Sequence, residues 1–393
     1  MKNLVAKYAQ RLRSAGLAEN PLVCGLDDQL VFNRADDCSP VLARVMAGMH
    51  CTALVCAEPT EPYRTILAFL ARKYPAVITP GDCETRTFLH DLPVTRILSA
   101  EAILPHLHRR KSVIVAGKED QVRIVTFGTV SPEQAFVTFS SVCFSALVLF
   151  FAEYLADLRA GRATHDQEAA YARAVSLLPP LPAAPPRLMP GLLTGEQQVI
   201  RAMIEAGRHT VEYRLVDSYF GNISCRLGDT VYISQTGSSL DELAGCIDPC
   251  PLDDSSCAGI TASSELTAHT EIYLRTECRT ILHGHPPFAV ILSMDCEIAD
   301  CPNRGKCHLR CDQARFIRDI PIVPGEVGTG PTGLCHTLPP AITGRRGAIV
   351  WGHGLFTTGS MDFNEPFRNL LEIEKQCRQE FFRCIGQASS ITC

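Results

Sequence analysis

The sequence lacks three features that would restrict its class at once: an excess of charge of one sign, a long apolar run and an export signal. Lys and Arg number 37 against 42 Asp and Glu, a formal net charge of -5. This balance excludes a general basic surface for nucleic acid and a polybasic patch for a membrane. The most apolar run, residues 142–152, is shorter than the roughly 20 residues that cross a bilayer. We therefore expect neither a nucleic acid nor a membrane as a partner. We expect residues 142–152 to form a buried helix.

The N-terminal residues 1–17 place four basic residues among apolar ones at helical spacing. They lack the uninterrupted apolar core and the cleavage site of a signal peptide. The chain has 19 cysteines, an odd and high number that favours reduced thiols or metal ligation over a disulfide framework. A hydrophobic content of 46% with 20% charged residues is typical of a folded globular protein. We therefore expect a cytoplasmic protein.

Proline density divides the chain. Six of the 26 prolines lie between residues 177 and 190, and this density excludes helix interiors and central strands. We predict a Pro-rich linker over 177–190, which separates a domain over 1–176 from a domain over 191–393. Strands alternating with helices in both halves indicate layered α/β domains.

The C-terminal half carries three histidines at predicted strand ends. His283 and His285 end one apolar strand, and His353 stands between two glycines at the end of another. Residues two apart in a strand point to the same face, so His283 and His285 can address one ion. Three neutral imidazoles and one open position are typical of catalytic zinc. The alternative is that the two neighbouring histidines only cap a strand.

A run of Ser263, Ser264 and Glu265 precedes the helix that leads to the His283 strand. Two hydroxyls beside the free amides of a helix N-terminus form a phosphate-sized anion site. Glu265 could then take a proton from a carbon or hydroxyl of a substrate held by the metal. The alternative is ordinary helix capping, with Ser263 or Ser264 as the N-cap and Glu265 in the first turn.

The two halves repeat short patterns. Residues 61–81 align without a gap to residues 265–285, and residues 128–136 parallel residues 359–367. The spacing predicts a tandem duplication. In this alignment Thr79 and Gly81 stand opposite the paired histidines, and Glu61 stands opposite the acidic residue at 265. We therefore expect no catalytic zinc in the first half, whose role would be structural or to supply residues to a site at an interface.

Cysteines gather after the His283 strand. Thirteen of the 19 lie between residues 225 and 393, and four of them follow one another closely: Cys296, Cys301, Cys307 and Cys311. Turn-forming residues between them would let the segment wrap a second zinc or an iron–sulfur cluster. The spacing matches no standard C-x2-C pattern, so free thiols are the alternative.

The C-terminal half resembles the class II sugar-phosphate aldolases, the zinc-dependent group that shares its fold with adducin heads. The resemblance covers about residues 192–383 in five motifs: Gly221-Asn222-Ile223-Ser224, Ile233-Ser234-Gln235-Thr236-Gly237, Ser263-Ser264-Glu265 with His269, His283-Gly284-His285-Pro286-Pro287-Phe288-Ala289, and Gly352-His353-Gly354. The chain departs from the family at Gly284, at Gln235 and after His285, which alters the pocket more than the metal chemistry.

The resemblance implies roles for these residues. His283, His285 and His353 would bind Zn²⁺ or another divalent metal, and Glu265 would be the catalytic acid/base. The substrate phosphate would be bound by residues of three motifs: Gly221, Asn222, Thr236, Gly237, Ser263 and Ser264. The fold would be α/β with tandem class II aldolase-like domains, each a central, mainly antiparallel sheet flanked by helices. The first domain would be a degenerate duplicate.

The activity implied is that of a class II aldolase, a carbon–carbon lyase of carbohydrate metabolism. It would cleave a phosphorylated sugar or similar hydroxy-carbonyl compound by a retro-aldol reaction through an enediolate. The alternatives are a sugar-phosphate epimerase or dehydratase of the same superfamily, or a non-catalytic, adducin-like assembly protein without metal. Class II aldolases form four-subunit rings, so we expect a homo-oligomer, a dimer of two-domain chains in a pseudo-fourfold ring.

Overall fold

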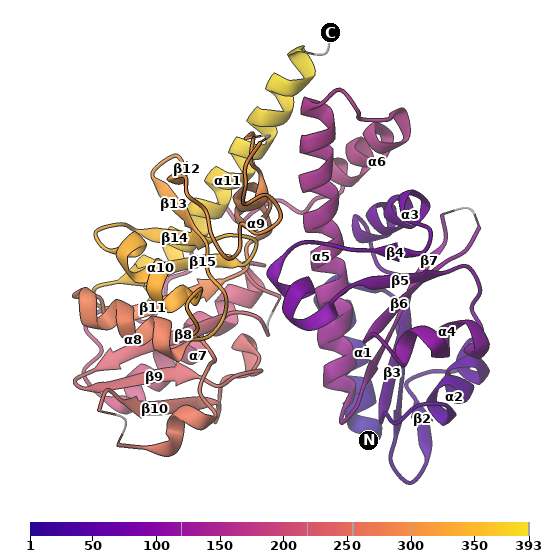
Figure 1. Cartoon of the computed structure of the whole chain (residues 1–393). Coiled ribbons are helices and arrows are strands. Elements are labelled where there is room, and N and C mark those ends of the chain that lie inside the picture. The colour runs from indigo at the N-terminus through magenta and orange to yellow at the C-terminus, as the bar shows by residue number, and fades with distance from the viewer. Residues whose placement is uncertain (119, 218, 254, 299, 392–393) are drawn as a thin grey trace. The chain divides into compact units, whose positions relative to one another are not determined.

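The computed structural model describes residues 1–391 except 119, 218, 254 and 299. The chain forms two compact units, Met1–Pro179 and Pro180–Cys393, each described by itself below (Figure 1). Each unit is a mixed α/β structure with one mainly antiparallel sheet between helices, which confirms the predicted fold class.

The first unit contains a seven-stranded sheet. In spatial order its strands are β2 (Leu30–Phe32), β1 (Leu22–Leu26), β3 (Ala53–Ala57), β7 (Val122–Gly128), β6 (Ser112–Ala116), β5 (Leu92–Thr95) and β4 (Val77–Ile78). Neighbouring strands are antiparallel except β5 and β6, which are parallel. The central strands β3 and β6 are buried along their whole length, so helices cover both faces.

Helices cover the first sheet in two layers. The helices of this unit are α1 (Lys2–Ser14), α2 (Ser39–Ala47), α3 (Tyr63–Lys73), α4 (Ala100–Leu107), α5 (Pro132–Arg159) and α6 (His165–Ser176), with a π-helical turn η1 (Thr85–Leu89). One core joins α2 and α4 to the sheet, while α1, α3 and α5 pack on strands β1, β3, β6 and β7. The apolar helix α5 is long enough to cross a membrane, but 78% of its most apolar window is buried inside the protein. This is the buried helix predicted at residues 142–152.

The second unit contains an eight-stranded sheet. Its strands lie in the order β10 (Ile247–Pro251), β9 (Thr230–Ser234), β8 (Asn222–Leu227), β11 (Thr280–Gly284), β15 (Gly354–Gly359), β14 (Gly347–Val350), β13 (Ile320–Val323) and β12 (Arg315–Ile317). Only β13 and β14 are parallel neighbours among these described strands. The central strand β11 is buried throughout.

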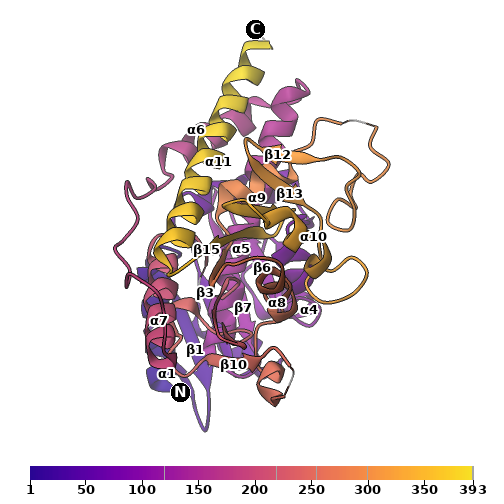
Figure 2. The same cartoon turned by 90° about the vertical axis from the view of Figure 1, so that its left-hand side faces the viewer.

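The helices of the second unit are α7 (Glu196–Glu212), α8 (Leu266–Arg275), α9 (Pro287–Met294), α10 (Leu334–Ile342) and α11 (Asn364–Ile391), with short 3-10 turns η2 (Leu240–Glu242) and η3 (Cys257–Ile260). One core joins α8 and α10 to the sheet. Helix α11 packs on β11, β15 and α9. Figure 2 shows α11 beside α9 and β15. The predicted site residues lie at the end of β11 and in the turn after β14.

The predicted linker over 177–190 contains the division between the two units, and hydrogen bonds hold its later part to the second unit. Helix α6 ends at Ser176, and the chain from Pro180 onward belongs to the second unit. The amide of Leu188 donates to Asn364 Oδ1 at 3.0 Å, and the Lys375 ammonium donates to the Ala183 carbonyl at 2.7 Å. Since proline lacks an amide donor, the segment is held to α11 by side-chain hydrogen bonds rather than by strand pairing.

The two sheets share one connectivity. The order β2-β1-β3-β7-β6-β5-β4 repeats β9-β8-β11-β15-β14-β13-β12, with the same parallel and antiparallel neighbours. Helix α2 leads into β3 as α8 leads into β11, so the gap-free alignment of 61–81 with 265–285 is wrong. That alignment matched α3, which follows β3, with α8, which precedes β11.

Candidate metal centre

Three connections of the second unit bring the predicted catalytic residues together. Glu265 is the N-cap of α8, and His283 lies in β11 with His285 directly after it. His353 lies in the turn between β14 and β15. Because β11 and β14 are both neighbours of β15, the end of one strand and the turn after the other meet at one edge of the sheet.

The three histidines form a group that can hold a metal ion. One ring nitrogen of each of His283, His285 and His353 lies within 4.8 Å of the others, and all three side chains are buried. Nε2 of His285 lies 3.1 Å from Nε2 of His283. Among the described residues this is the one such group of His, Cys, Asp or Glu. The alternative of histidines that merely cap a strand does not account for the convergence of the third.

Neighbouring groups orient the His283 ring. Its Nδ1 lies 3.2 Å from the carbonyl of Leu355 on the adjacent strand, and the ring stacks on Phe356 at 3.8 Å between centroids. A hydrogen bond from Nδ1–H to a carbonyl leaves Nε2 unprotonated and available as a ligand.

Burial keeps the imidazoles of His283 and His285 neutral. It lowers the pKa of His283 to about 3 and holds that of His285 well below its ordinary value. A protonated ring cannot bind a metal, so a low pKa favours the ligand form at neutral pH. Nδ1 of His353 is buried without a hydrogen-bond partner among the described residues. These residues fit a divalent cation by donor type, spacing and protonation.

Glu265 lies against this group. Its Oε1 is 3.1 Å from Nε2 of His353, and its Oε2 is 3.6 Å from Nε2 of His283. The side-chain amide of Asn222 donates to Oε2 at 2.7 Å. Burial opposes ionisation, but His283, His353 and Asn222 together hold the pKa of Glu265 below its ordinary value. The site therefore places the Glu265 carboxyl group in direct contact with two of the three histidines.

Glycine is required beside the histidines. A Cβ at Gly354 would lie 2.5 Å from the carbonyl oxygen of Gly284, 2.6 Å from the His283 ring and 2.8 Å from the His285 ring. Gly352 has a φ of +60° in the turn before His353, a conformation that glycine adopts without strain. The glycines of the Gly352-His353-Gly354 motif thus leave room for the two rings and shape the turn.

The residues predicted to bind phosphate lie in two places. Thr236, Ser263 and Ser264 form one cluster, where the Ser264 amide donates to Thr236 Oγ1 at 2.9 Å and Thr236 Oγ1 donates to the Ala262 carbonyl at 3.0 Å. Gly237 extends this cluster with a φ of +71°. The N-cap of α8 is Glu265, and its amide donates to Ser263 Oγ at 3.3 Å, so a capping role for Ser263 stays an alternative.

The other two predicted phosphate residues lie at the start of β8. Asn222 bonds to Glu265, as described above, and its Oδ1 is buried without a hydrogen-bond partner among the described residues. A Cβ at Gly221 would lie 2.6 Å from the His283 carbonyl oxygen. This pair is therefore placed beside the histidines, next to the acid/base.

Sequence reasoning missed Tyr273 and Glu374, two buried residues of the second unit. Ser224 Oγ lies 2.7 Å from both Nδ1 of His269 and the Tyr273 hydroxyl. Glu374 on α11 accepts hydrogen bonds from the amides of Phe288 and Ala289 at 3.0 and 2.9 Å, which fixes the start of α9 after the paired histidines. No local pattern marks Tyr273 or Glu374, because their partners lie far away in the sequence.

The four clustered cysteines lie between α9 and β12. Their thiols are partly buried, and burial raises the pKa of Cys307, with smaller contributions from the other three thiols. The Cys307 thiol points to the Asn303 carbonyl at 3.5 Å, and the Cys311 thiol to the Gln313 carbonyl at 3.5 Å. A second metal site formed with Cys296 and Cys301 stays a prediction.

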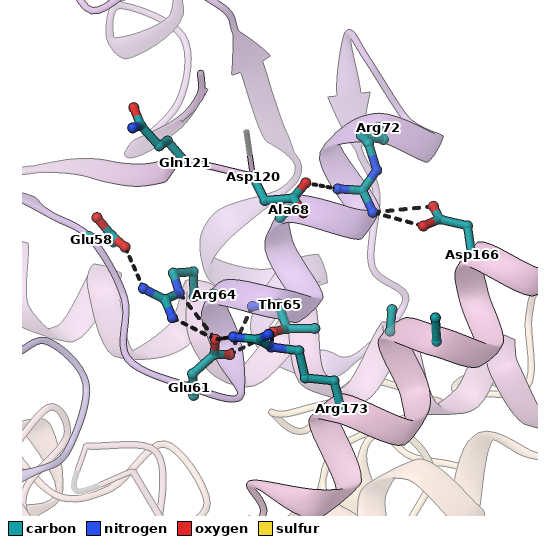
Figure 3. A pocket seen from close by; sticks show the side chains of 12 residues that line it. Glu58, Glu61, Arg64, Thr65, Ala68, Arg72, Asp120, Gln121, Asp166 and Arg173 are labelled. Atoms are coloured by element: carbon teal, nitrogen blue, oxygen red, sulfur yellow. Dashed lines mark hydrogen bonds and ion pairs between the residues drawn. The ribbon is translucent and has the colours of Figure 1, made fainter. Parts of the chain in front are cut away.

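A polar cavity of about 500 Å³ lies in the first unit. Figure 3 shows that its arginines already pair with carboxylates: Arg64 with Glu58 and Glu61, and Arg173 with Glu61. These bonds lower the pKa of Glu61 to about 2 against the effect of burial. Arg72 pairs with two further carboxylates. Glu61 precedes α3 and is not the counterpart of Glu265.

The second unit is thus a layered α/β domain with a buried three-histidine site and an adjacent carboxylate. The sequence profile of the class II aldolase and adducin N-terminal domain matches residues 201–381. A methylthioribulose-1-phosphate dehydratase of Gluconobacter oxydans is 32% identical over 172 residues, 40% of this chain and 80% of that protein. The chain belongs to the class II aldolase and adducin family, which confirms the resemblance found in the C-terminal half.

Two further similar proteins match a smaller part of this chain or have a lower sequence identity to it. A probable bifunctional methylthioribose-1-phosphate isomerase/methylthioribulose-1-phosphate dehydratase of Nocardia farcinica is 28% identical over 123 residues, 29% of this chain and 20% of that protein. The solved l-fuculose-1-phosphate aldolase of Thermus thermophilus has 21% identity and a TM-score of 0.39, over 49% of this chain and 97% of that one.

Proposed function

We propose that the second unit is a divalent-metal-dependent lyase that eliminates water from a phosphorylated keto-sugar. The observation that carries the proposal is the Glu265 carboxyl group within 3.1 Å of His353 and 3.6 Å of His283. The 32% identity to a methylthioribulose-1-phosphate dehydratase supports water elimination and this substrate class. It moves our preference from the aldol cleavage expected from the sequence to dehydration.

The residues of the site have separate tasks in this reaction. A divalent cation on His283, His285 and His353 would supply Lewis-acid stabilisation for negative charge on the substrate oxygens. Glu265 takes the proton from the carbon next to the substrate carbonyl, and the Asn222 amide at 2.7 Å keeps Oε2 in place. Glu265 then returns the proton to the departing hydroxyl, which leaves as water.

We propose that the substrate phosphate binds at the cluster of Thr236, Gly237, Ser263 and Ser264. This cluster lies at the start of α8, where the helix dipole favours an anion. Ser264 is exposed while Ser263 is buried, so the former can reach a ligand directly. Gly221 and Asn222 would contact the sugar end, since they lie beside the histidines.

Retro-aldol cleavage is the second candidate. The five motifs stand in the order found in class II aldolases. Breaking a carbon–carbon bond next to the carbonyl group creates negative charge on the same substrate oxygens as dehydration does. Glu265 would accept the proton of the hydroxyl rather than that of the carbon. Both reactions thus use the same residues and differ in the bond that breaks.

The proposal also covers the identity of the cation, the cellular compartment and the origin of the first unit. Zinc fits three histidines with an open position. The described cysteines are all free thiols, which supports a reducing cytoplasm. The shared strand order of the two sheets supports a tandem duplication in which the first unit has lost the histidines.

Product analysis decides between the reactions. Zinc-loaded protein is incubated with methylthioribulose 1-phosphate and with fuculose 1-phosphate, and products are identified by mass spectrometry and NMR. Dehydration gives a product lighter by one water, cleavage gives two fragments, and epimerisation leaves the mass unchanged. A product with the mass of the substrate, or no product from either substrate, would contradict the proposed lyase.

A matched pair of variants tests the role of Glu265. Glu265→Gln should lower turnover by roughly 10²- to 10⁴-fold, the usual contribution of a general acid/base, with little change in metal content. Glu271→Gln on the same helix, a residue paired with Arg275 away from the histidines, should retain wild-type turnover. Full activity of Glu265→Gln would refute its role.

A further inference from the structure

The first unit contains a structural counterpart of the metal site. Cys38 is the N-cap of α2 and precedes Cys56 of β3 by 18 residues, just as Glu265, the N-cap of α8, precedes His283 of β11 by 18 residues. The strand pairing agrees, because β3 lies between β1 and β7 as β11 lies between β8 and β15. Cys38 therefore takes the place of Glu265, and Cys56 that of His283.

The Arg123 side chain on β7 extends to Cys38. Val115 of β6 pairs with Arg123 of β7, as Val350 of β14 pairs with Gly354 of β15. Gly354 is the residue whose missing side chain leaves room for the metal-site histidines. In the first unit the Arg123 side chain extends from the equivalent position.

The three side chains contact one another. Arg123 Nη1 lies 2.7 Å from the Cys38 sulfur, and Cys38 and Cys56 are hydrogen-bonded. Cys38 keeps 7% of its surface exposed and Cys56 keeps 2%. Both sulfurs are therefore in mutual contact and close to a fixed positive charge, and Cys38 is the more accessible.

The electrostatics favour a thiolate at Cys38. The hydrogen bond with Cys56 and the charge of Arg123 lower the pKa of Cys38 against the effects of burial and of Asp36. Asp36 is itself paired with Arg34, at 2.5 Å, and accepts the Cys38 amide at 2.8 Å. Charged groups from three segments thus surround Cys38, and the hydrogen bond with Cys56 makes the largest contribution to its lowered pKa.

Other buried cysteines of the same unit differ. Cys24 lies in the same core, and burial raises its pKa to about 12. Cys51 also has a raised pKa because of burial. No arginine contributes to the pKa shift of either thiol. They provide internal references for the reactivity of Cys38.

We propose that the first unit has a thiol modification site in place of the metal site: Cys38 reacts as a thiolate with small peroxides, and Cys56 then closes a reversible disulfide with it. Burial of Cys56 beside the attacking sulfur makes it the resolving thiol. Arg123 supplies the fixed positive charge that the divalent cation would supply in the second unit.

Oxidation of the pair consumes one peroxide. The Cys38 thiolate attacks one oxygen of hydrogen peroxide, the O–O bond breaks, and the departing hydroxide takes up a proton as water. The sulfenic acid formed on Cys38 is attacked by the Cys56 sulfur, the S–O bond breaks, and a second water leaves. Two thiols are oxidised by two electrons, and one peroxide is reduced to two waters.

Peptide mapping tests this site in the full chain. Reduced protein is treated with a small molar excess of hydrogen peroxide at pH 7, blocked with an alkylating reagent and digested with trypsin. Cleavage after Arg34, Arg44 and Arg64 separates the peptide of Cys38 from that of Cys51 and Cys56. We expect the two peptides to be joined through Cys56, as tandem mass spectrometry identifies, and released by reductant.

Variants separate reactivity from packing. Arg123→Gln removes the positive charge beside Cys38 and should slow alkylation of Cys38 at pH 7 by about threefold or more. Arg123→Lys should restore most of that rate, and Cys24 should react equally slowly in all three proteins. Cys56→Ser should leave Cys38 as a sulfenic acid, which a dimedone probe captures.

Two results would overturn the proposal. One is that Cys38 reacts with peroxide no faster than Cys24 in the wild-type chain. The other is that oxidised Cys38 is found without a link to Cys56. Because the readout is peptide mass rather than turnover, neither result depends on the lyase proposal.

Discussion

The substitution Gly354→Ala tests how the metal-site histidines are held. The added methyl group would lie 2.5 Å from a backbone carbonyl oxygen of Gly284, 2.6 Å from His283 and 2.8 Å from His285. The Gly284 backbone cannot easily retreat, because β11 is paired on both sides with β8 and β15. The His283 ring is also confined, because it stacks on Phe356 at 3.8 Å.

The size of the effect follows from these contacts. Inserting a methyl group into a closely packed site typically costs about 1 to 3 kcal/mol. Here the atoms that must move include two proposed ligands. Borne by the zinc-loaded state, this cost raises the dissociation constant for zinc by roughly 5- to 150-fold, at about 1.4 kcal/mol per factor of ten.

Zinc affinity is measured by competition with a chromogenic chelator, and circular dichroism checks that the fold is retained. Gly386→Ala is the matched control, because its Cβ would meet nothing within 4 Å in α11. That substitution should leave zinc affinity unchanged and stabilise the helix by up to about 1 kcal/mol. A folded Gly354→Ala protein with an affinity within twofold of wild type would refute the reasoning.

Three further predictions concern stability, phosphate binding and assembly. Burial raises the pKa of Glu374 to about 8, so the stability that the protonated side chain contributes is present at acidic pH and lost as pH rises through 8. In urea unfolding, the free energy of unfolding of Glu374→Gln should therefore depend less on pH between 5 and 8 than that of the wild type. Parallel pH curves for the two proteins would contradict this. Ser264→Ala should raise KM about tenfold for the phosphorylated substrate and less than twofold for its dephosphorylated form, whereas equal changes would argue against phosphate binding there. Light scattering should give the mass of two chains, as the pseudo-fourfold ring requires, and one or four chains would exclude that ring.

Much of the fold followed from local patterns. Alternating apolar segments predicted the helix–sheet layers, and proline density predicted a boundary near the observed division at Pro179. The repeat was harder to align, because α3 and α8 are both helices that precede a short strand. Strand order distinguishes them, since it depends on pairing between residues far apart in the sequence.

The candidate site was predictable where its residues lie close together in the sequence. The spacing of His283 and His285 in one strand, and the glycines around His353, indicated convergence before the sheet was known. The thiol site was not predictable in this way. Cys38 and Arg123 are 85 residues apart, and only the pairing of β6, β7 and β3 brings them together.

The central claim is that His283, His285 and His353 bind one divalent cation in the second unit. Elemental analysis of the purified wild-type chain and of His283→Ala, both loaded with zinc and passed over a desalting column, tests it most directly. Because a second site at the clustered cysteines would add equally to both proteins, the difference between them is decisive. We predict that the variant holds one zinc fewer per chain; equal zinc content in the two proteins would contradict the account.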